Sequence, residues 1–353
     1  MFELIIALSI IMVKITVVFS VLMLIIAYVT LMERKVLGHM QVRHGPRRVG
    51  WHGLLQPIAD GIKLFFKEEI IVTEANKGLY HLAPVLYMTC ALAIYAVIPF
   101  GNEINVLGRI IPLHIADVNI GILYIFAIAS LGVYGVVLAG WSSNNKYSLL
   151  GAIRASAQIV SYELALGLSV IGVLMIAGSL SMVEIVNAQR NVWFILLQPF
   201  GFLLYLICAF AECCRTPFDL VECENELVAG YQTEYSSMKF ALFYLAEYTH
   251  IIAVSAIAVT LFLGGWRDPL MSPVVWILDR IPVLGSLTIQ LIGLVPSVIW
   301  FLVKVIVLVF FFIWVRATYP RFRYDQLMGF GWKVLLPLTL VNIVVTAFIM
   351  VII

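Results

Sequence analysis

Charged residues are scarce in this sequence, and their scarcity excludes a water-soluble fold. Asp, Glu, Lys and Arg make up 12% of the 353 residues, hydrophobic residues make up 63%, and the mean hydropathy is +1.04. A soluble domain exposes far more polar surface than this composition supplies. The formal net charge of +2 says little about partners, and we expect no nucleic acid among them.

The sequence signatures of bound cofactors are also missing. There is no GxGxxG, P-loop or HExxH motif, so neither a dinucleotide fold nor a zinc-hydrolase helix is indicated. The five cysteines form no CxxC pair, and we expect free thiols rather than disulfides or iron–sulfur ligands at Cys90, Cys208, Cys213, Cys214 and Cys223. Any redox chemistry or nucleotide hydrolysis then belongs to a partner protein.

Long apolar runs dominate the sequence. A run of about 20 apolar residues is long enough to cross a bilayer as a helix, and a helix satisfies its backbone polar groups internally. We therefore expect an all-α integral membrane protein that forms a single polytopic domain over residues 1–353. About eight transmembrane helices are predicted, at 5–31, 81–100, 118–140, 156–178, 193–211, 238–264, 288–315 and 333–352. The first run lacks a basic start and a cleavage site, so we do not interpret it as a signal peptide.

The distribution of Lys and Arg predicts the orientation of these spans. Sixteen of the 22 lie in the loops on one side and four on the other, while Lys14 and Lys304 fall inside spans. Because basic loops face the cytoplasm, both termini are predicted to be periplasmic.

A short amphipathic segment follows the first span. Residues 54–68 have apolar side chains at helical spacing, with Asp60 on another face. The segment is too short and too charged to cross the membrane, so we expect a helix at the interface. It is either an anchor or the wall of a cavity with Asp60 directed inward. The preceding loop, 41–53, presents three arginines to lipid head groups or a docked protein.

An acidic segment at about 211–237 lies between two apolar runs on the cytoplasmic side. It has six carboxylates against a single Arg215: Glu212, Asp219, Glu222, Glu224, Glu226 and Glu234. The conventional interpretation is a solvated acidic loop. Alternating apolar residues argue instead for a packed segment, in which crowded carboxylates hold protons near neutral pH.

Two more carboxylates, Glu163 and Glu247, lie inside predicted spans, about two turns from the cytoplasmic end. An intramembrane carboxylate is either neutralised for packing or functional. With Glu212 and the acidic segment, they are at a depth consistent with one polar path. His250 lacks a second ligand at i+4, which favours a satisfied polar residue over a metal ligand. Lys304 is either a relay group or a snorkelling cation.

Several long motifs occur together in one order. They are ERK at 33–35, GPRRVG at 45–50, RASAQIVSYE at 154–163, AECCRTPFDLVECENELVAGYQTEY at 211–235 and RATYPRFRYDQLMGFGWK at 316–333. In these motifs the chain resembles the family of H subunits, the quinone-cavity membrane subunits of bacterial proton-translocating NADH:quinone oxidoreductase, respiratory complex I. The resemblance covers about residues 33–340.

The resemblance implies a membrane subunit that anchors the peripheral arm and forms part of the quinone cavity. The cavity residues would be Arg34, Lys35, Asp60, Arg215, Phe218 and Asp219. The proton-coupling residues would be Glu163, Glu212, Glu222, Glu224, Glu226, Glu234 and Glu247. The implied substrate is a quinone such as ubiquinone. NADH, FMN and the iron–sulfur clusters would belong to peripheral-arm partners, with membrane-arm subunits and membrane lipids as neighbours.

The sequence departs from the family at Gly132, where many members carry a Glu. One channel carboxylate is then missing, so that it is either dispensable here or replaced by a water or another side chain. Two other functions are alternatives to a quinone-cavity subunit. The membrane subunit of a hydrogenase or formate hydrogenlyase would keep the acidic segment without a quinone. A free-standing ion transporter would show an inverted repeat, and the sequence has none.

Overall fold

The computed structural model describes residues 2–106, 109–220, 227–269 and 295–352. The long helices are α1 (Phe2–Met40), α3 (Lys77–Ala93), α4 (Gly121–Ser142), α5 (Lys146–Ala177), α8 (Pro199–Glu212), α10 (Ser237–Phe262), α13 (Ser297–Thr318) and α15 (Leu336–Ile352). The shorter helices are α2 (Gln56–Phe66), α6 (Met182–Ala188), α7 (Phe194–Leu197) and α14 (Tyr324–Phe330). Single helical turns occur at Trp51–Gly53, Ile94–Ala96, Gly230–Gln232 and Gly331–Leu335.

The predicted all-α membrane architecture is confirmed. In the described part of the chain, seven helices are long and apolar enough to cross a membrane. One small hairpin interrupts the helical pattern, because β1 (Glu103–Val106) pairs antiparallel with β2 (Arg109–Pro112). The helix α2 lies within the predicted 54–68 segment, while its place at the membrane surface stays a prediction.

The predicted span 193–211 is wrong as a continuous helix. The structure has α7 and α8 there, with a break at Gln198. Pro199 is the first residue of α8 and has no N–H to donate to the preceding turn, which favours a new helix start. Because 14 residues rise only about 21 Å, α8 alone is shorter than the hydrocarbon core of about 30 Å.

Other spans differ from prediction at their ends. Helix α1 continues to Met40, so that Glu33, Arg34 and Lys35 are helical. Helix α5 begins ten residues earlier than predicted, where the side chain of Asn145 accepts a hydrogen bond from the N–H of Tyr147 at 2.9 Å.

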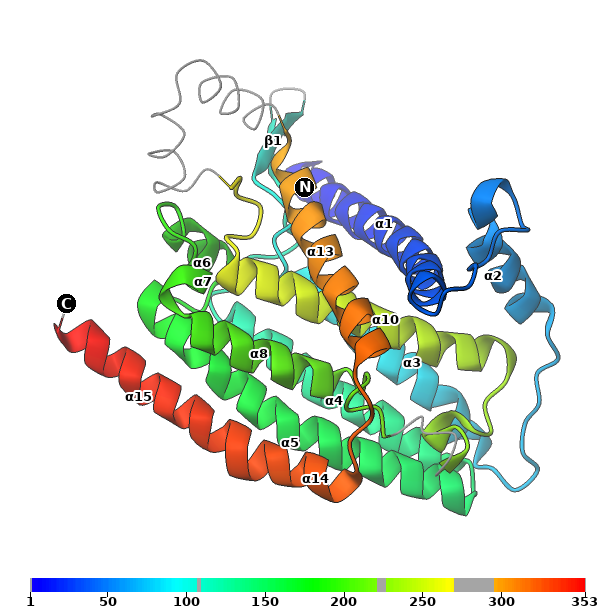
Figure 1. The fold of residues 1–353 in the computed structure, drawn as a ribbon. Coiled ribbons are helices and arrows are strands. Elements are labelled where there is room, and N and C mark those ends of the chain that lie inside the picture. Colours follow the sequence, from blue (N-terminus) through cyan, green and yellow to red (C-terminus); the bar gives the residue numbers. More distant parts are fainter. Residues whose placement is uncertain (1, 107–108, 221–226, 270–294, 353) are drawn as a thin grey trace.

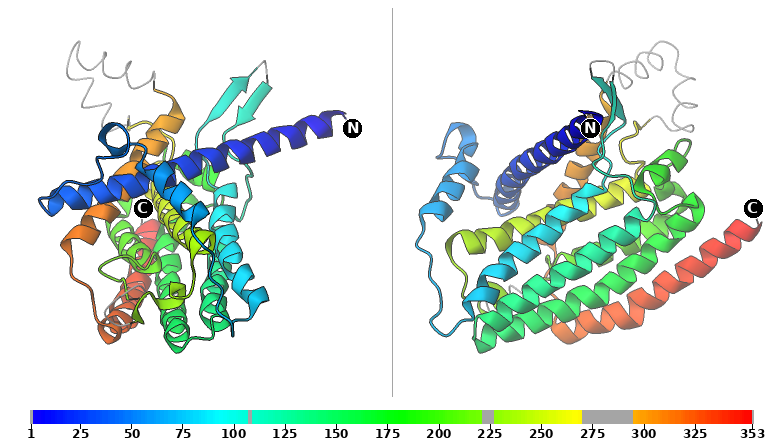
Figure 2. Two further views of the ribbon diagram at one scale, coloured as in Figure 1. Left: turned by 90° about the vertical axis from the view of Figure 1, so that its right-hand side faces the viewer. Right: turned by 180° about the vertical axis from the view of Figure 1, so that it is seen from behind.

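Helix α10 lies at the centre of the molecule. Every residue from Ala246 to Phe262 is buried except the half-buried His250. Helix α5 packs against α4, α8 and α15, while α10 packs against α3 and α13 (Figure 1). Helix α1 instead lies across the other helices (Figure 2), and most of its surface is exposed.

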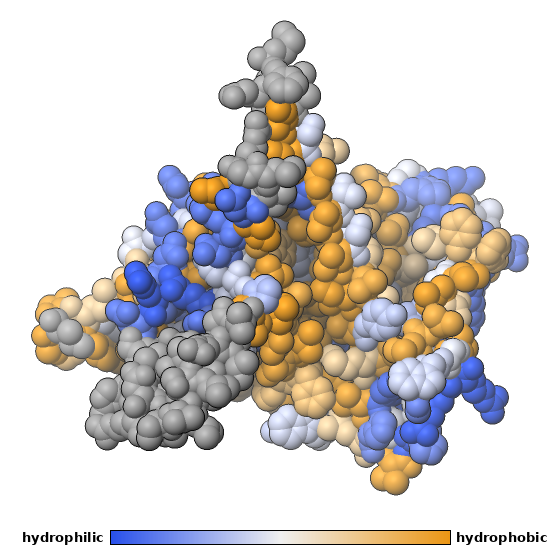
Figure 3. Space-filling view, turned by 90° about the horizontal axis from the view of Figure 1, so that it is seen from above, coloured by the Kyte–Doolittle hydropathy of each residue, from blue (hydrophilic) through white to orange (hydrophobic). Residues whose placement is uncertain are grey.

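The surface agrees with a membrane environment. In the view from above, apolar residues cover broad stripes and hydrophilic residues gather in groups toward both sides (Figure 3). Large apolar side chains are exposed along α1, α13 and α15. Such a surface is favourable against lipid or neighbouring membrane helices.

Candidate functional site: a buried ionic cluster and membrane carboxylates

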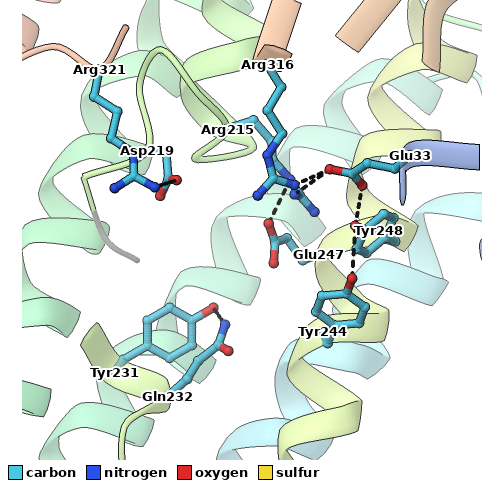
Figure 4. Close-up of polar contacts among 10 residues, drawn as sticks. All are labelled: Glu33, Arg215, Asp219, Tyr231, Gln232, Tyr244, Glu247, Tyr248, Arg316 and Arg321. Atoms are coloured by element: carbon cyan, nitrogen blue, oxygen red, sulfur yellow. Dashed lines mark hydrogen bonds and ion pairs between the residues drawn. The ribbon is translucent and has the colours of Figure 1, made fainter. Parts of the chain in front are cut away.

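Four charged side chains from distant parts of the chain meet where α1, α10 and α13 approach the segment after α8 (Figure 4). We call Glu33, Arg215, Glu247 and Arg316 the ionic cluster. The Nε atom of Arg215 lies 2.9 Å from Oε1 of Glu247, and its Nη1 atom lies 3.6 Å from Oε1 of Glu33. Arg316 binds the same Glu33 oxygen. Arg215 therefore bridges a carboxylate of α1 and one of α10.

Three members of the ionic cluster are buried, Arg316 is 29% exposed, and the four formal charges balance. The side chains of Arg215, Glu33 and Glu247 are 7%, 6% and 9% exposed. Removing a charge from water costs several kcal/mol per ion, and only close opposite charges offset this cost. Two cations and two anions satisfy that condition. A change in the charge of any one member would disturb the others.

Two tyrosine hydroxyls extend the ionic cluster. Tyr248 donates a hydrogen bond to Glu33, and Tyr244 donates one to Tyr248 at 3.0 Å. The guanidinium carbon of Arg215 lies 4.6 Å from the ring centroid of Tyr248, within cation–π range. Because a hydroxyl both donates and accepts hydrogen bonds, the two tyrosine hydroxyls form a hydrogen-bonded path along which Glu33 could exchange a proton.

A second ion pair joins α1 to α2. Arg34 binds Asp60, whose other oxygen accepts a hydrogen bond from Gln56 at 2.9 Å. The pair is more exposed than the ionic cluster, at 45% and 33%. Lys35 instead lines a hollow of about 330 Å³ together with Arg47. Arg34 borders a neighbouring hollow of about 460 Å³ with several basic residues.

The carboxylates inside the spans have separate partners. Ser130 of α4 donates a hydrogen bond to Glu163 of α5. Nε2 of His250 in α10 lies 3.3 Å from Oε1 of Glu212, the last residue of α8. Glu163 interacts electrostatically with both Glu212 and His250. The predicted acids Glu163 and Glu212 therefore lie near one another, and Glu247 belongs to the ionic cluster.

The described part of the acidic segment is packed rather than solvated. Gln158 of α5 donates to the carbonyls of Ala211 and Phe218 at 2.8 and 2.9 Å. The ring of Phe218 stacks on that of Phe322, with centroids 5.5 Å apart. Asp219 is 3% exposed and accepts from Arg321 at 3.0 Å. The interpretation as a solvated loop is thus wrong for these residues.

The end of this segment lies against the start of α5. Glu234 accepts a hydrogen bond from Asn145 at 2.5 Å, and its carbonyl accepts one from Tyr80 at 2.6 Å. Burial raises the pKa of the nearby Tyr235 phenol to about 12, so this hydroxyl stays neutral at physiological pH. The predicted residues Glu222, Glu224 and Glu226 lie outside the described residues.

The described thiols do not form ligand clusters. Cys90, Cys208, Cys213 and Cys214 form no disulfide bond, and burial raises the pKa of the Cys213 thiol well above its usual value. A buried protonated thiol is a poor metal ligand and a poor nucleophile. No group of three His, Cys, Asp or Glu within the described ranges is suited to a metal ion.

A protein-family model described as NADH dehydrogenase matches residues 13–347. The chain belongs to the NADH dehydrogenase family. It is 53% identical over 345 residues to the first of two NADH-quinone oxidoreductase H subunits of Geobacter sulfurreducens, covering 94% of this chain and 92% of that protein. It is 53% identical over 348 residues to an H subunit of Geobacter metallireducens, covering 95% and 94%. An H subunit of Rhizobium meliloti is 47% identical over 344 residues, covering 98% of both chains.

Sequence reasoning missed several residues of this member of the NADH dehydrogenase family. Glu33 and Arg316 are typical of charged residues at span ends, and that pattern indicates only a membrane anchor. Tyr244 and Tyr248 gave no signal apart from their place beside Glu247. His250 was expected to be a satisfied polar residue, and its contact with Glu212 supplies the partner.

Proposed function

We propose that this chain is the quinone-cavity membrane subunit of a proton-translocating NADH:quinone oxidoreductase in the inner membrane. It anchors the peripheral arm, forms part of the quinone cavity and couples quinone reduction to proton translocation. The family assignment and the names of the relatives support the first part. The ionic cluster supports the second part, because it joins the segment after α8 to a carboxylate within α10.

In this proposal the quinone head group approaches along the α1–α2 side. The Arg34–Asp60 pair connects α1 to the amphipathic helix α2, and Lys35 lines a basic hollow beside it. Arg215, Phe218 and Asp219 form the inner wall toward the acidic segment. The family pattern assigns NADH, FMN and iron–sulfur clusters to the peripheral-arm subunits. The electron donor to the quinone is therefore a partner's cluster.

Coupling in this proposal is electrostatic. A unit charge that forms about 8 Å from a glutamate at an effective dielectric constant of 20 changes its energy by about 2 kcal/mol. That energy is enough to alter which of two nearby groups holds a proton. Arg215 contacts Glu33 and Glu247, so a charge change on the cavity side reaches a carboxylate inside α10. Glu212 and Glu163 continue the path toward neighbouring membrane subunits.

Purification tests the quinone part of this proposal. The chain is isolated from its native membrane in mild detergent, the co-purifying subunits are identified, and NADH:quinone activity is measured with and without a quinone-site inhibitor. We expect a large assembly with inhibitor-sensitive activity. Recovery with hydrogenase subunits and no such activity would remove the quinone from the account.

Substitution of Glu163 tests the coupling part. Glu163→Gln should lower quinone-linked turnover about tenfold or more, since removal of a positioned proton carrier commonly costs about 10²–10⁴-fold. NADH oxidation by artificial acceptors should stay intact. Glu184→Gln is the matched control, because Glu184 also accepts a hydrogen bond from a serine, Ser179, but is exposed on α6. Native quinone turnover in Glu163→Gln would contradict the proposal.

A further inference from the structure

A small cavity lies where α3, α4, α5, α8 and α10 meet. Its volume is about 30 Å³, and its walls include Cys90, Gly132, Ile159, Glu212 and His250. Most of the wall is apolar, and its polar residues are Tyr87, Cys90, Glu212 and His250. The cavity therefore places one carboxylate and one imidazole in a largely apolar space.

Gly132 leaves this space open. An added Cβ atom at Gly132 would meet only Cys90 and Tyr87, the nearest atom at 3.6 Å, which is an ordinary contact distance. Side-chain atoms beyond Cβ would extend from this wall, so that the absence of a side chain here helps to form the cavity. Glycine in a helix interior costs about 0.5–1 kcal/mol relative to alanine, so the backbone gains nothing from it.

Glu212 needs a second hydrogen-bond partner within this space. The residue is 5% exposed, and its Oε1 atom contacts His250. Its Oε2 atom is buried and has no hydrogen-bond partner among the described residues. A buried carboxylate oxygen without a partner costs about 1–3 kcal/mol or more, so native structures supply one, commonly an ordered water.

We infer that the cavity beside Gly132 is a water-binding site, in which one water molecule donates a hydrogen bond to Oε2 of Glu212 and contacts the ring of His250. A space of about 10–15 Å³ is enough for one water when polar partners are present, and this cavity exceeds that volume. A metal ion fits poorly, because one carboxylate and one imidazole are too few ligands for a closed site.

The role of this water in coupling rests on the proposed function, whereas the presence of the water does not. Glu163 is bound by Ser130, which follows the cavity-lining Ala129 in α4, and it interacts electrostatically with Glu212 and His250. A water on Oε2 provides Glu212 with a proton donor and acceptor at the oxygen that does not contact His250 directly. The water thus occupies the position that a longer side chain at residue 132 would fill.

Electron microscopy of the assembled complex, at a resolution that shows ordered water, tests the inference. We expect a density peak at hydrogen-bond distance from Oε2 of Glu212 in the native chain. Gly132→Val fills the space with apolar atoms and should lose the peak. Gly167→Val is the matched control, because Gly167 is also inside a helix and an added Cβ there meets nothing within 4 Å; it should keep the peak.

The native map alone decides the inference if Gly132→Val does not assemble. An empty cavity in the native chain, in a map that shows other buried waters, would overturn it, as would a peak that persists in Gly132→Val. Failure of the coupling proposal has a different signature. If the peak is present and the Glu212→Gln complex pumps protons normally, the water site is confirmed and its role in coupling is contradicted.

Discussion

Arg215 is the residue on which the ionic cluster depends. It contacts Glu33 and Glu247 and lies over the ring of Tyr248. Arg316 adds a second cation to Glu33, whereas the ion pair of Glu247 is with Arg215. Loss of Arg215 would therefore leave two buried anions facing one cation.

Arg215→Met should destabilise the folded protein strongly. Removing one partner of a buried ion pair typically costs about 3–5 kcal/mol, because the remaining charge stays buried. Thermal unfolding of the purified assembly measures this loss, and Glu247→Gln in the same chain should recover part of it. Arg323→Met is the matched control, since its pair with Asp325 is 74% and 59% exposed, and should change stability little. Equal effects of the two arginine variants would contradict this account.

The membrane acids could be predicted from the sequence, but most of their partners could not. A carboxylate inside an apolar run is a strong signal by itself, and Glu163 and Glu247 were predicted on that basis. Their contacts join residues far apart in the chain, such as Tyr248 with Glu33 and Arg316 with Glu33. Helical periodicity determines the face of a residue, not which helix packs against that face.

At the scale of the elements, Lys304 anchors the end of α10 to α13. Its Nζ atom donates to the carbonyls of Leu263, Gly265 and Arg267 at 2.7, 3.1 and 2.7 Å. It also lies 4.2 Å from the ring centroid of Trp193. The three ammonium protons match these three acceptors, which belong to the turn that follows α10. The sequence did not distinguish between a proton-relay role and a snorkelling role for Lys304. This geometry favours a structural cation.

Lys304→Met should lower stability without changing coupling. Hydrogen bonds to charged groups contribute about 1.5–3 kcal/mol each, so we expect a large fall in the unfolding temperature. Lys14→Met is the matched control, because Lys14 donates to a single carbonyl, that of His114 at 3.0 Å. The Lys304→Met complex that does assemble should keep its ratio of protons to electrons. Normal stability with lost proton translocation would indicate a relay.

The break between α7 and α8 shows why element ends were harder to predict than elements. Gln198 donates to Thr346 at 2.7 Å and accepts from Asn342 at 3.3 Å, both on α15. These hydrogen bonds connect the break at Gln198 to a helix that lies more than 140 residues later in the sequence. Pro199 was a local signal for it, whereas the partner on α15 had none.

At the scale of the whole molecule, the buried carboxylates Glu33, Glu212 and Glu247 lie on or against the central helix α10. Helix α10 provides Glu247, Tyr248 and His250, and these contact groups on α1, α8 and the segment after α8. Because α10 is almost wholly buried, the polar groups along it face protein rather than lipid. The predicted orientation, with periplasmic termini, would place the ionic cluster toward the cytoplasmic side, the side on which the proposed function requires the peripheral arm to dock.

The central claim is that buried carboxylates of this chain couple quinone reduction to proton translocation. The most direct test reconstitutes the assembled complex in proteoliposomes and measures NADH:quinone turnover and proton translocation together, for the native chain, Glu212→Gln and the control Glu184→Gln. The account predicts that Glu212→Gln lowers both rates while NADH oxidation by artificial acceptors stays normal, and that Glu184→Gln matches the native chain. Native rates of turnover and translocation in an assembled Glu212→Gln complex would contradict it.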